Sequence, residues 1–371
     1  MQQLYFDYNA STPVHAKVAA AMQAALESYG NPSSSHWAGT PARLIVENSR
    51  RQIARLLGCE PDEVVFTSGG SEANNLALKG LAFARGVANT HIVTTAVEHP
   101  AILAPCEFLK RLGATCTVIP VDGTGRIDPD GLRRAIKPNT TLISVMHANN
   151  EVGSIQPIAE CARVAREHGI PFHTDAAQTV GKIATQTAAL GVDMLSIAGH
   201  KIYAPKGIGA LYVRSGLTLE PLIHGAQHER GRRAGTESAV LCAALGTACT
   251  LAMDLAPNED IRKLRDLFWH GLQERFGARV VLNGHPALRL PNTLNVSFLG
   301  AVGSEILARF PDIAASTGSA CHAGSIELSP VLKAMGITPE NGVGAVRFSL
   351  GLKTTRAQVD SALAQLSTLK I

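Results

Sequence analysis

Hydrophobic and polar positions alternate in blocks over residues 63–215, and these blocks predict strands and helices in turn. Short apolar runs predict strands at residues 63–67, 91–95, 115–121, 141–146 and 170–174, the last of them buried. Longer segments between them have the spacing of helices, at residues 71–85, 102–112 and 157–168. Strands that alternate with helices in this way are typical of a mostly parallel sheet with helices on both faces.

A different pattern follows this alternating region. An apolar segment at 237–253 predicts a long helix, and residues 256–258 predict a linker. Beyond the linker come signals for a helix, two strands, a helix and a strand, and an amphipathic helix at 356–369. The predicted fold class is therefore α/β, with a second, smaller α+β domain near the C-terminus. The predicted parts are a large domain at 15–256, a small domain at 257–371 and an N-terminal arm at 1–14 that packs against the small domain.

Composition narrows the class of protein. Of the 371 residues, 46% are hydrophobic and 17% are charged, as in globular rather than disordered chains. The net charge of +4 is small and no basic tract occurs, which argues against nucleic acid as a partner. The densest basic cluster consists of Arg230, Arg232 and Arg233. It indicates either a solvated loop or a contact to a phosphate. No apolar run is long enough for a bilayer and no signal peptide is evident, so we expect a cytoplasmic location.

The seven cysteines suit neither a disulfide framework nor a zinc site, and we expect no metal. Their number is odd, and no Cys-x-x-Cys pair occurs. Most lie in apolar segments and are expected to be inert thiols, among Cys59, Cys106, Cys116, Cys161, Cys242 and Cys249. Cys321 differs, because residues 315–325 are small and polar and predict a mobile loop. His322 beside it favours a thiolate at neutral pH, whereas a structural cysteine would need apolar neighbours.

Two polar side chains end consecutive predicted strands in the middle of the chain. Asp175 follows the strand at 170–174, and Lys201 follows an apolar run at 193–197. Ligands bind at the carboxyl ends of the strands in such sheets. An enzyme that uses pyridoxal phosphate needs a lysine to form the Schiff base and a carboxylate to pair with the pyridinium nitrogen. The pair therefore predicts a pyridoxal phosphate site, although a surface lysine and a carboxylate paired with an arginine or a helix N-terminus are the alternatives.

Other polar residues follow the predicted strands. Gly70 and Ser71 open a helix whose free N–H groups suit a phosphate, or they form an ordinary strand-to-helix turn with a serine cap. His99 precedes a helix, where it would stack on a cofactor ring and transfer protons, or simply cap the helix. Asn150 and Gln178 are amides at strand ends that bind a ligand or belong to loops.

Arg347 lies inside an apolar strand pattern, Val346-Arg347-Phe348. A buried arginine needs an anionic partner. That partner is a substrate carboxylate held by the guanidinium fork or an internal carboxylate in an ion pair.

Taken together, these residues and their neighbours match one family. The sequence resembles the cysteine desulfurases and the related selenocysteine lyases, which belong to the class V aminotransferase group of fold type I pyridoxal phosphate enzymes. The matching segments run in family order over nearly the whole chain. They are residues 5–13, 30–34, 67–72, 98–99, 149–153, 173–178, 199–203, 233–237, 318–321 and 347–349.

The resemblance implies a role for each of the chemical groups. Lys201 would bind the cofactor covalently, Asp175 would pair with its pyridine nitrogen, and His99 would stack on its ring and shuttle protons. Cys321 would attack the sulfur of L-cysteine and become a persulfide, with L-alanine as co-product. An acceptor protein would then take the sulfur.

The resemblance also assigns contacts to the rest of the cofactor and to the substrate. The phenolic oxygen of the cofactor would contact Gln178. The cofactor phosphate would contact Gly70, Ser71 and His200, together with Thr236 of the partner subunit in a homodimer. The amino-acid substrate would contact Asn9, Asn150 and Arg347.

One position departs from the family pattern. Many desulfurases have serine where this chain has Ala198, so one hydroxyl donor to the phosphate is missing. Three features resemble selenocysteine lyases more than desulfurases. They are the apolar residue at this position, His322 after Cys321, and the pair Tyr8-Asn9. The sequence thus predicts a cysteine desulfurase, with a selenocysteine lyase as the alternative and an inactive sulfur-transfer scaffold as a remote one.

Overall fold

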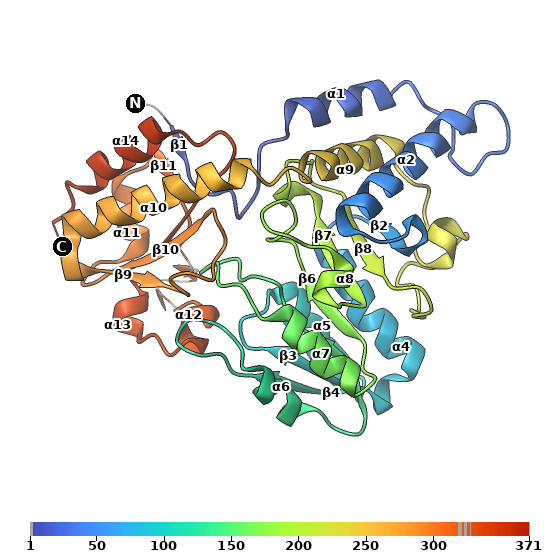
Figure 1. Ribbon diagram of the computed structural model, residues 1–371, viewed down its shortest axis with the longest axis horizontal. Helices are drawn as coiled ribbons and strands as arrows, with labels where there is room; N and C mark the ends of the chain where they lie inside the picture. Colours follow the sequence, from blue (N-terminus) through green and yellow to red (C-terminus); the bar gives the residue numbers. More distant parts are fainter. Residues whose placement is uncertain (1–2, 318–320, 323–324, 327, 371) are drawn as a thin grey trace.

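The computed structural model describes residues 3–317, 321–322, 325–326 and 328–370 (Figure 1). Its largest sheet has seven strands from residues 64–213, and a second sheet has three strands from residues 280–349. Figure 1 shows the two sheets on opposite sides of the molecule, with helix α10 (Pro257–Phe276) on the side of the smaller sheet and helix α9 (Ala239–Leu251) on the side of the larger one.

The seven-stranded sheet confirms the predicted mostly parallel arrangement. Its order is β2-β8-β7-β6-β5-β3-β4. Neighbouring strands from β7 to β4 are parallel, whereas β8 is antiparallel to both of its neighbours. The strands are β2 (Val64–Thr67), β3 (His91–Thr95), β4 (Thr115–Ile119), β5 (Thr140–Ser144), β6 (Phe172–Asp175), β7 (Met194–Ala198) and β8 (Gly209–Val213).

Helices cover both faces of this sheet, and successive side chains of a strand point into different cores. Leu195 packs in one core, and Met194, its neighbour on β7, packs in the other. The first core lies under α1 (Ala16–Ala25), α2 (Gly39–Leu57), α6 (Pro129–Ala135), α7 (Ile158–Glu167) and α9. The second lies under α3 (Gly70–Asn75), α4 (Leu81–Arg85) and α5 (Pro100–Arg111). A π-helical turn at Leu76–Gly80 joins α3 to α4, so the helix that begins at Gly70 runs on to Arg85.

The second sheet is antiparallel, with the order β14-β10-β9. Its strands are β9 (Val280–Asn283), β10 (Thr293–Phe298) and β14 (Ala345–Ser349). Its core includes side chains of α10, α11 (Gly303–Arg309) and α14 (Arg356–Leu366). The N-terminal segment joins this core, because Leu4 and Phe6 are buried in it and β1 (Leu4–Tyr5) pairs with β11 (Ile313–Ala314).

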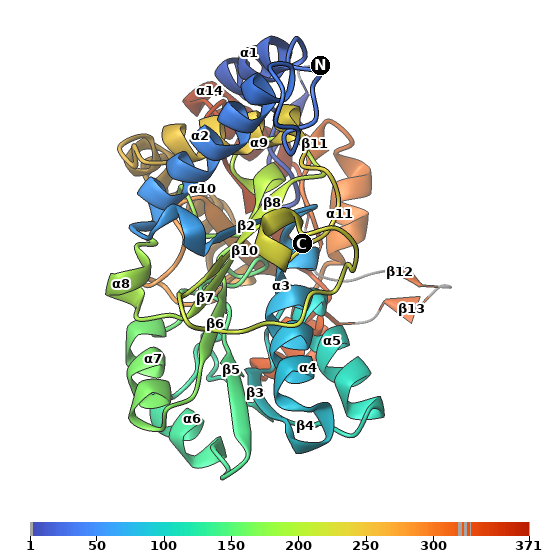
Figure 2. The same ribbon diagram turned by 90° about the vertical axis from the view of Figure 1, so that its right-hand side faces the viewer.

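The remaining elements are short. Helix α8 (Thr187–Leu190) precedes β7, and α12 (Pro330–Ala334) and α13 (Pro339–Gly342) precede β14. The predicted loop at 315–325 contains the backbone of a hairpin, β12 (Cys321–His322) and β13 (Ser325–Ile326), which extends away from both sheets in Figure 2. No helix within the described ranges combines the length and apolar character needed to cross a membrane.

The prediction of a linker at residues 256–258 is wrong. Ala256 is the N-cap of α10, and Pro257 is its first residue. Proline fits that position because the first helical N–H would have no partner inside the helix. The Pro-Asn pair that suggested a linker therefore marks a helix start.

Candidate active site

A cleft of about 490 Å³ lies at the carboxyl ends of the parallel strands. The predicted site residues that line it come from the N-terminal arm, both sheets and their loops. They are Asn9, Gly70, Ser71, His99, Asn150, Asp175, Gln178, His200, Lys201 and Arg347. Thr236 does not line this cleft, and the side chain of Cys321 lies outside the described part of the structure.

Lys201 enters the cleft from a tight 3-10 turn, Gly199–Lys201, directly after β7. The turn requires glycine at its start, because a Cβ on Gly199 would lie 2.8 Å from the carbonyl oxygen of Ile208. The Lys201 Nζ donates to the carbonyl oxygens of Asn9 and of Ala10, the latter at 2.8 Å. Burial and the positive charge of Arg347 lower the pKa of Lys201 to about 8. A lysine in this state is a nucleophile near neutral pH.

Asp175 is the last residue of β6, and only 6% of it is exposed. Its Oδ2 accepts a hydrogen bond of 2.7 Å from the Asn74 side chain, and its Oδ1 accepts one of 2.9 Å from the Ala177 N–H. No described basic side chain forms an ion pair with it. The carboxylate thus faces the cleft held by neutral donors, with capacity left for a cationic partner.

His99 caps a helix, as one of the two alternatives predicts, and its stacking and proton-transfer role stays a prediction. It is the N-cap of α5, and its Nδ1 accepts a hydrogen bond of 3.1 Å from the Ala101 N–H. It also lines the cleft. Because Nδ1 acts as an acceptor, the neutral ring carries its proton on Nε2. Burial and the charge of Lys201 lower the pKa of His99, against the opposing effect of Asp175, which favours this neutral form.

The wall between β2 and α3 is built for a close approach to an anion. Gly69 has φ of 156° and is the N-cap of α3, the helix that continues to Arg85. A Cβ on Gly70 would lie 3.1 Å from the Ala198 Cβ, a tight contact that would require a small shift of the neighbour. His200 faces the same cleft, and its pKa is lowered to about 4 by burial and by Lys201 and Lys206. Lys206, which the sequence analysis missed, adds an exposed positive charge to the lining.

Arg347 has the internal carboxylate partner that the sequence analysis considered. Its guanidinium NH2 group lies 2.7 Å from the Asp7 carboxylate, and its NH1 group donates to the Asn150 carbonyl oxygen at 2.9 Å. Its Nε is buried without a hydrogen-bond partner among the described residues. The arginine thus lines the cleft with part of its donor capacity unused.

Asn9 and Gln178 meet at the back of the cleft. The Asn9 side chain donates to the Asn150 carbonyl and Thr293 Oγ1, and accepts from Asn292 at 2.9 Å. These partners favour a positioning role for Asn9 over direct contact with a substrate. Its backbone carbonyl accepts from Gln178 Nε2 at 3.0 Å, as it does from Lys201.

Thr236 lines a separate cavity of about 120 Å³ behind the β2 loop. The loop that carries it is fixed by Glu229, whose carboxylate accepts two hydrogen bonds from the buried Arg50, at 2.7 and 2.8 Å. Glu229 also accepts from the Phe66 N–H at 2.8 Å. This ion pair ties the loop to α2 and β2.

The arginine cluster at 230–233 has internal partners in the described structure, and the phosphate-contact alternative stays a prediction. Arg230 pairs with the Asp62 carboxylate, and Arg232 donates to the Asp62 carbonyl oxygen at 2.7 Å. Arg233 pairs with Glu72 at 2.9 Å. The cluster fastens its loop to the segment before β2 and to α3.

The donor set fits pyridoxal phosphate. The cleft holds a nucleophilic lysine, a buried carboxylate without an ion-pair partner, and a histidine, next to a glycine-lined helix start. These groups match an aldehyde, a pyridinium nitrogen, an aromatic ring and a phosphate, respectively.

The six cysteines outside β12 are free thiols, and burial raises the pKa of Cys59, Cys161 and Cys249 to about 12.

Comparison with known proteins gives the same result. Residues 4–362 match the family model of class-V aminotransferases. The cysteine desulfurase IscS of Dictyoglomus turgidum is 46% identical over 99% of this chain and 94% of its own length. The mitochondrial cysteine desulfurase of Arabidopsis thaliana is 40% identical over 97% of this chain and 81% of its own.

Solved structures agree with the sequences. A NifS-like protein superposes with a TM-score of 0.93 at 35% identity, covering 99% of this chain and 98% of its own. SspA in complex with cysteine gives 0.84 at 38% identity, covering 95% of this chain and 100% of its own. The predicted fold class and cofactor are confirmed, and the chain belongs to the class-V aminotransferase family of pyridoxal phosphate enzymes.

Proposed function

We propose that this chain is a pyridoxal phosphate-dependent cysteine desulfurase, which converts L-cysteine to L-alanine and captures the sulfur as a persulfide on Cys321. The observation that carries the proposal is one cleft in which Lys201, with its lowered pKa, lies with Asp175 and His99. Relatives named as cysteine desulfurases, and the solved complex of SspA with cysteine, support the substrate.

The residues of the cleft contact different parts of the cofactor. Lys201 is the covalent attachment point, Asp175 holds the ring nitrogen, and Gln178 holds the phenolic oxygen. The phosphate site consists of Gly70, Ser71 and His200, with Thr236 from the partner subunit. Bound pyridoxal phosphate supplies an electron sink next to the substrate Cα, which weakens the bond between Cβ and sulfur.

His99 moves the proton in this scheme. Its Nδ1 is committed to the Ala101 N–H, so proton exchange takes place at Nε2. The lowered pKa keeps the ring ready to accept a proton near neutral pH.

Arg347 and Asn150 bind the substrate amino acid at the far wall of the cleft. Arg347 holds the substrate carboxylate through the N–H groups of its two terminal nitrogens that remain beside the contacts to Asn150 and to Asp7. Asp7 thereby keeps the fork in place before the substrate arrives.

Cys321 completes the reaction. Its thiolate attacks the sulfur of cysteine, a sulfur–sulfur bond forms, and the Cβ–S bond breaks. The electron pair of that bond stays on Cβ, which takes up a proton to give alanine, so cysteine plus thiol gives alanine plus persulfide. The persulfide sulfur then passes to an acceptor protein.

We further propose a homodimer. Thr236 lies outside the cleft of its own chain, as expected if it serves a neighbouring one. The segment between α1 and α2 exposes Tyr29 to 79% and Trp37 to 80%, at the edge of the molecule away from the small sheet (Figure 1). Large exposed aromatic side chains are typical of an interface.

The domains at 15–256 and 257–371 and the cytoplasmic location stay predictions.

The test is the release of alanine from cysteine, with sulfide measured in the presence of a thiol reductant. The wild-type chain should form both products, and Cys321→Ala should form neither while keeping its visible cofactor absorbance. Cys59→Ala, which removes a half-buried free thiol elsewhere, is the matched control and should retain activity. Turnover by Cys321→Ala equal to wild type would contradict the persulfide step.

Two other outcomes separate the alternatives. Turnover of selenocysteine with very little turnover of cysteine would establish a selenocysteine lyase. A purified protein without any visible absorbance, unchanged by Lys201→Ala, would establish a scaffold without the cofactor.

A further inference from the structure

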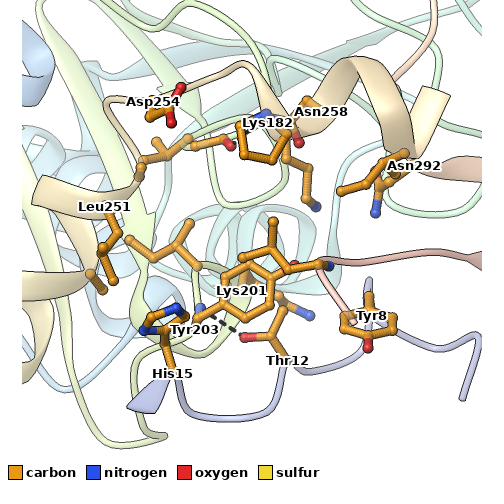
Figure 3. Close-up of a pocket in the computed structure, with 18 of the residues that line it drawn as sticks. Tyr8, Thr12, His15, Lys182, Lys201, Tyr203, Leu251, Asp254, Asn258 and Asn292 are labelled. Carbon is orange, nitrogen blue, oxygen red and sulfur yellow. Dashed lines mark hydrogen bonds between the residues drawn. The ribbon is translucent and has the colours of Figure 1, made fainter. Parts of the chain in front are cut away.

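A second cavity, of about 290 Å³, lies on the other side of Lys201 from the cleft. It is bounded by the N-terminal arm, the end of α9 and the start of α10, and most of its walls are apolar. Figure 3 shows Lys182 among the residues that line it, together with Lys201. Lys182 has no role in the scheme above, and the sequence analysis did not single it out.

Lys182 has only neutral partners in the described structure. Its Nζ donates to Gln178 Oε1 at 3.0 Å and to Asn9 Oδ1 at 3.5 Å. No described carboxylate forms an ion pair with it, and burial together with the charges of Lys201 and Arg347 lowers its pKa to about 7. Burying a lysine amine costs free energy unless its hydrogen bonds compensate for the lost water. We therefore expect this amine to have a function in the site.

The contact to Gln178 fixes which way its amide points. The Lys182 Nζ donates to the amide oxygen of Gln178, so this oxygen faces Lys182 and the NH2 group faces away. That NH2 group donates to the Asn9 carbonyl oxygen at 3.0 Å. The same oxygen accepts from Lys201, so the NH2 group that Lys182 helps to orient lies beside the Lys201 amine at the cleft.

We propose that Lys182 is a positioning residue that holds the Gln178 amide with its NH2 donor facing the cofactor cleft beside Lys201. The inference rests on the proposed function, because it takes the cleft as the pyridoxal phosphate site. Without Lys182 the amide oxygen loses its donor and the amide is held only through the Asn9 carbonyl, so its NH2 group is held less firmly at the cleft. The adjacent cavity leaves room for a longer side chain, so Lys182→Arg keeps a donor in place.

The test is a cycle of variants in which pyridoxal phosphate is titrated into cofactor-free protein. Lys182→Met should weaken binding about ten-fold, as expected for one buried hydrogen bond, and should move the visible absorbance maximum of the bound cofactor. Lys182→Arg should restore both. In a Gln178→Ala background, Lys182→Met should have no further effect, because the two residues act through one contact.

Lys137→Met is the matched control, since it removes one exposed charge from the same sheet region and should change neither readout. Equal weakening by Lys182→Met with and without Gln178 would overturn the proposal, as would an unchanged dissociation constant and spectrum. A wild-type chain that binds the cofactor but releases no alanine from cysteine would instead contradict the proposed function, and the cycle would still decide the role of Lys182.

Discussion

The amine of Lys201 should capture pyridoxal phosphate at neutral pH far faster than an ordinary lysine does. Burial and the charge of Arg347 lower its pKa from 10.5 to about 8. At a pH of about 7.5, roughly a quarter of the Lys201 amines then lack a proton, against about one in a thousand for an unperturbed lysine. Only the unprotonated amine attacks a carbonyl carbon, so the capture rate should be on the order of a hundred-fold higher than for a free lysine side chain.

The assay mixes cofactor-free protein with pyridoxal phosphate and follows the growth of the visible absorbance band as the pH is raised. Below a pH of about 8 the rate should rise about ten-fold per pH unit, and above it the rate should level off. The same titration of Nα-acetyl-lysine corrects for ionisations of the cofactor itself. Lys201→Ala gives the background from other lysines.

Arg347→Gln tests the cause of the shift. The positive charge of Arg347 disfavours the protonated amine, so its removal should move the levelling of the rate to higher pH. A corrected wild-type rate that keeps rising through a pH of about 10 would refute the lowered pKa. An unchanged profile in Arg347→Gln would refute the electrostatic part and leave burial alone as the cause.

Three further substitutions test the surroundings of the site. Asn74→Ala removes the 2.7 Å bond to the buried Asp175 and should cost about 1–3 kcal/mol in cofactor-free stability, measured by denaturant unfolding, and weaken cofactor binding. Glu229→Ala leaves Arg50 buried without its bidentate partner and should cost about 3–5 kcal/mol in the same assay, with much of the loss recovered when Arg50→Met is added. Ala198→Ser adds a hydroxyl donor to the cleft and should tighten pyridoxal phosphate binding by roughly five-fold, whereas weaker binding would mean that the space beside Gly70 is too small for it.

The sheet could be predicted because most of its strands are short apolar runs buried on both faces; the edge strand β4 is the exception. The strand predicted at 91–95 is β3, His91–Thr95, and the strand predicted at 170–174 is β6, which ends one residue later at Asp175. The alternation that made these runs visible also placed Asp175 and Lys201 at the same edge, since parallel strands put their carboxyl ends together. The linker failed for a local reason, because Pro257 can begin a helix as readily as it can interrupt one.

Contacts between distant parts of the chain could not be predicted. Arg233 pairs with Glu72 from 161 residues away, and nothing local to either residue indicates the other. Lys182 was missed for a related reason, because its proposed role is to orient the Gln178 amide and that orientation is set only in the folded chain. The one signal available was a lysine four residues after a site glutamine, in a segment without an acidic residue to pair with it.

The N-terminal arm explains how the two sheets come to share one site. The Asn9 N–H donates to Oγ of Ser349, the last residue of β14, and the Asn9 side chain donates to Thr293 of β10. The Asn9 carbonyl oxygen meanwhile accepts from Gln178 and from Lys201, which follow β6 and β7 of the large sheet. A residue near the start of the chain therefore joins the lysine that reacts to the sheet that carries Arg347. Since the arm is fastened to the small sheet through β1 and Phe6, any shift of that sheet would move the acceptor of the Lys201 amine with it. The carbonyls of Asn9 and Ala10 thus tie the proposed cofactor lysine on one sheet to the sheet that carries Arg347.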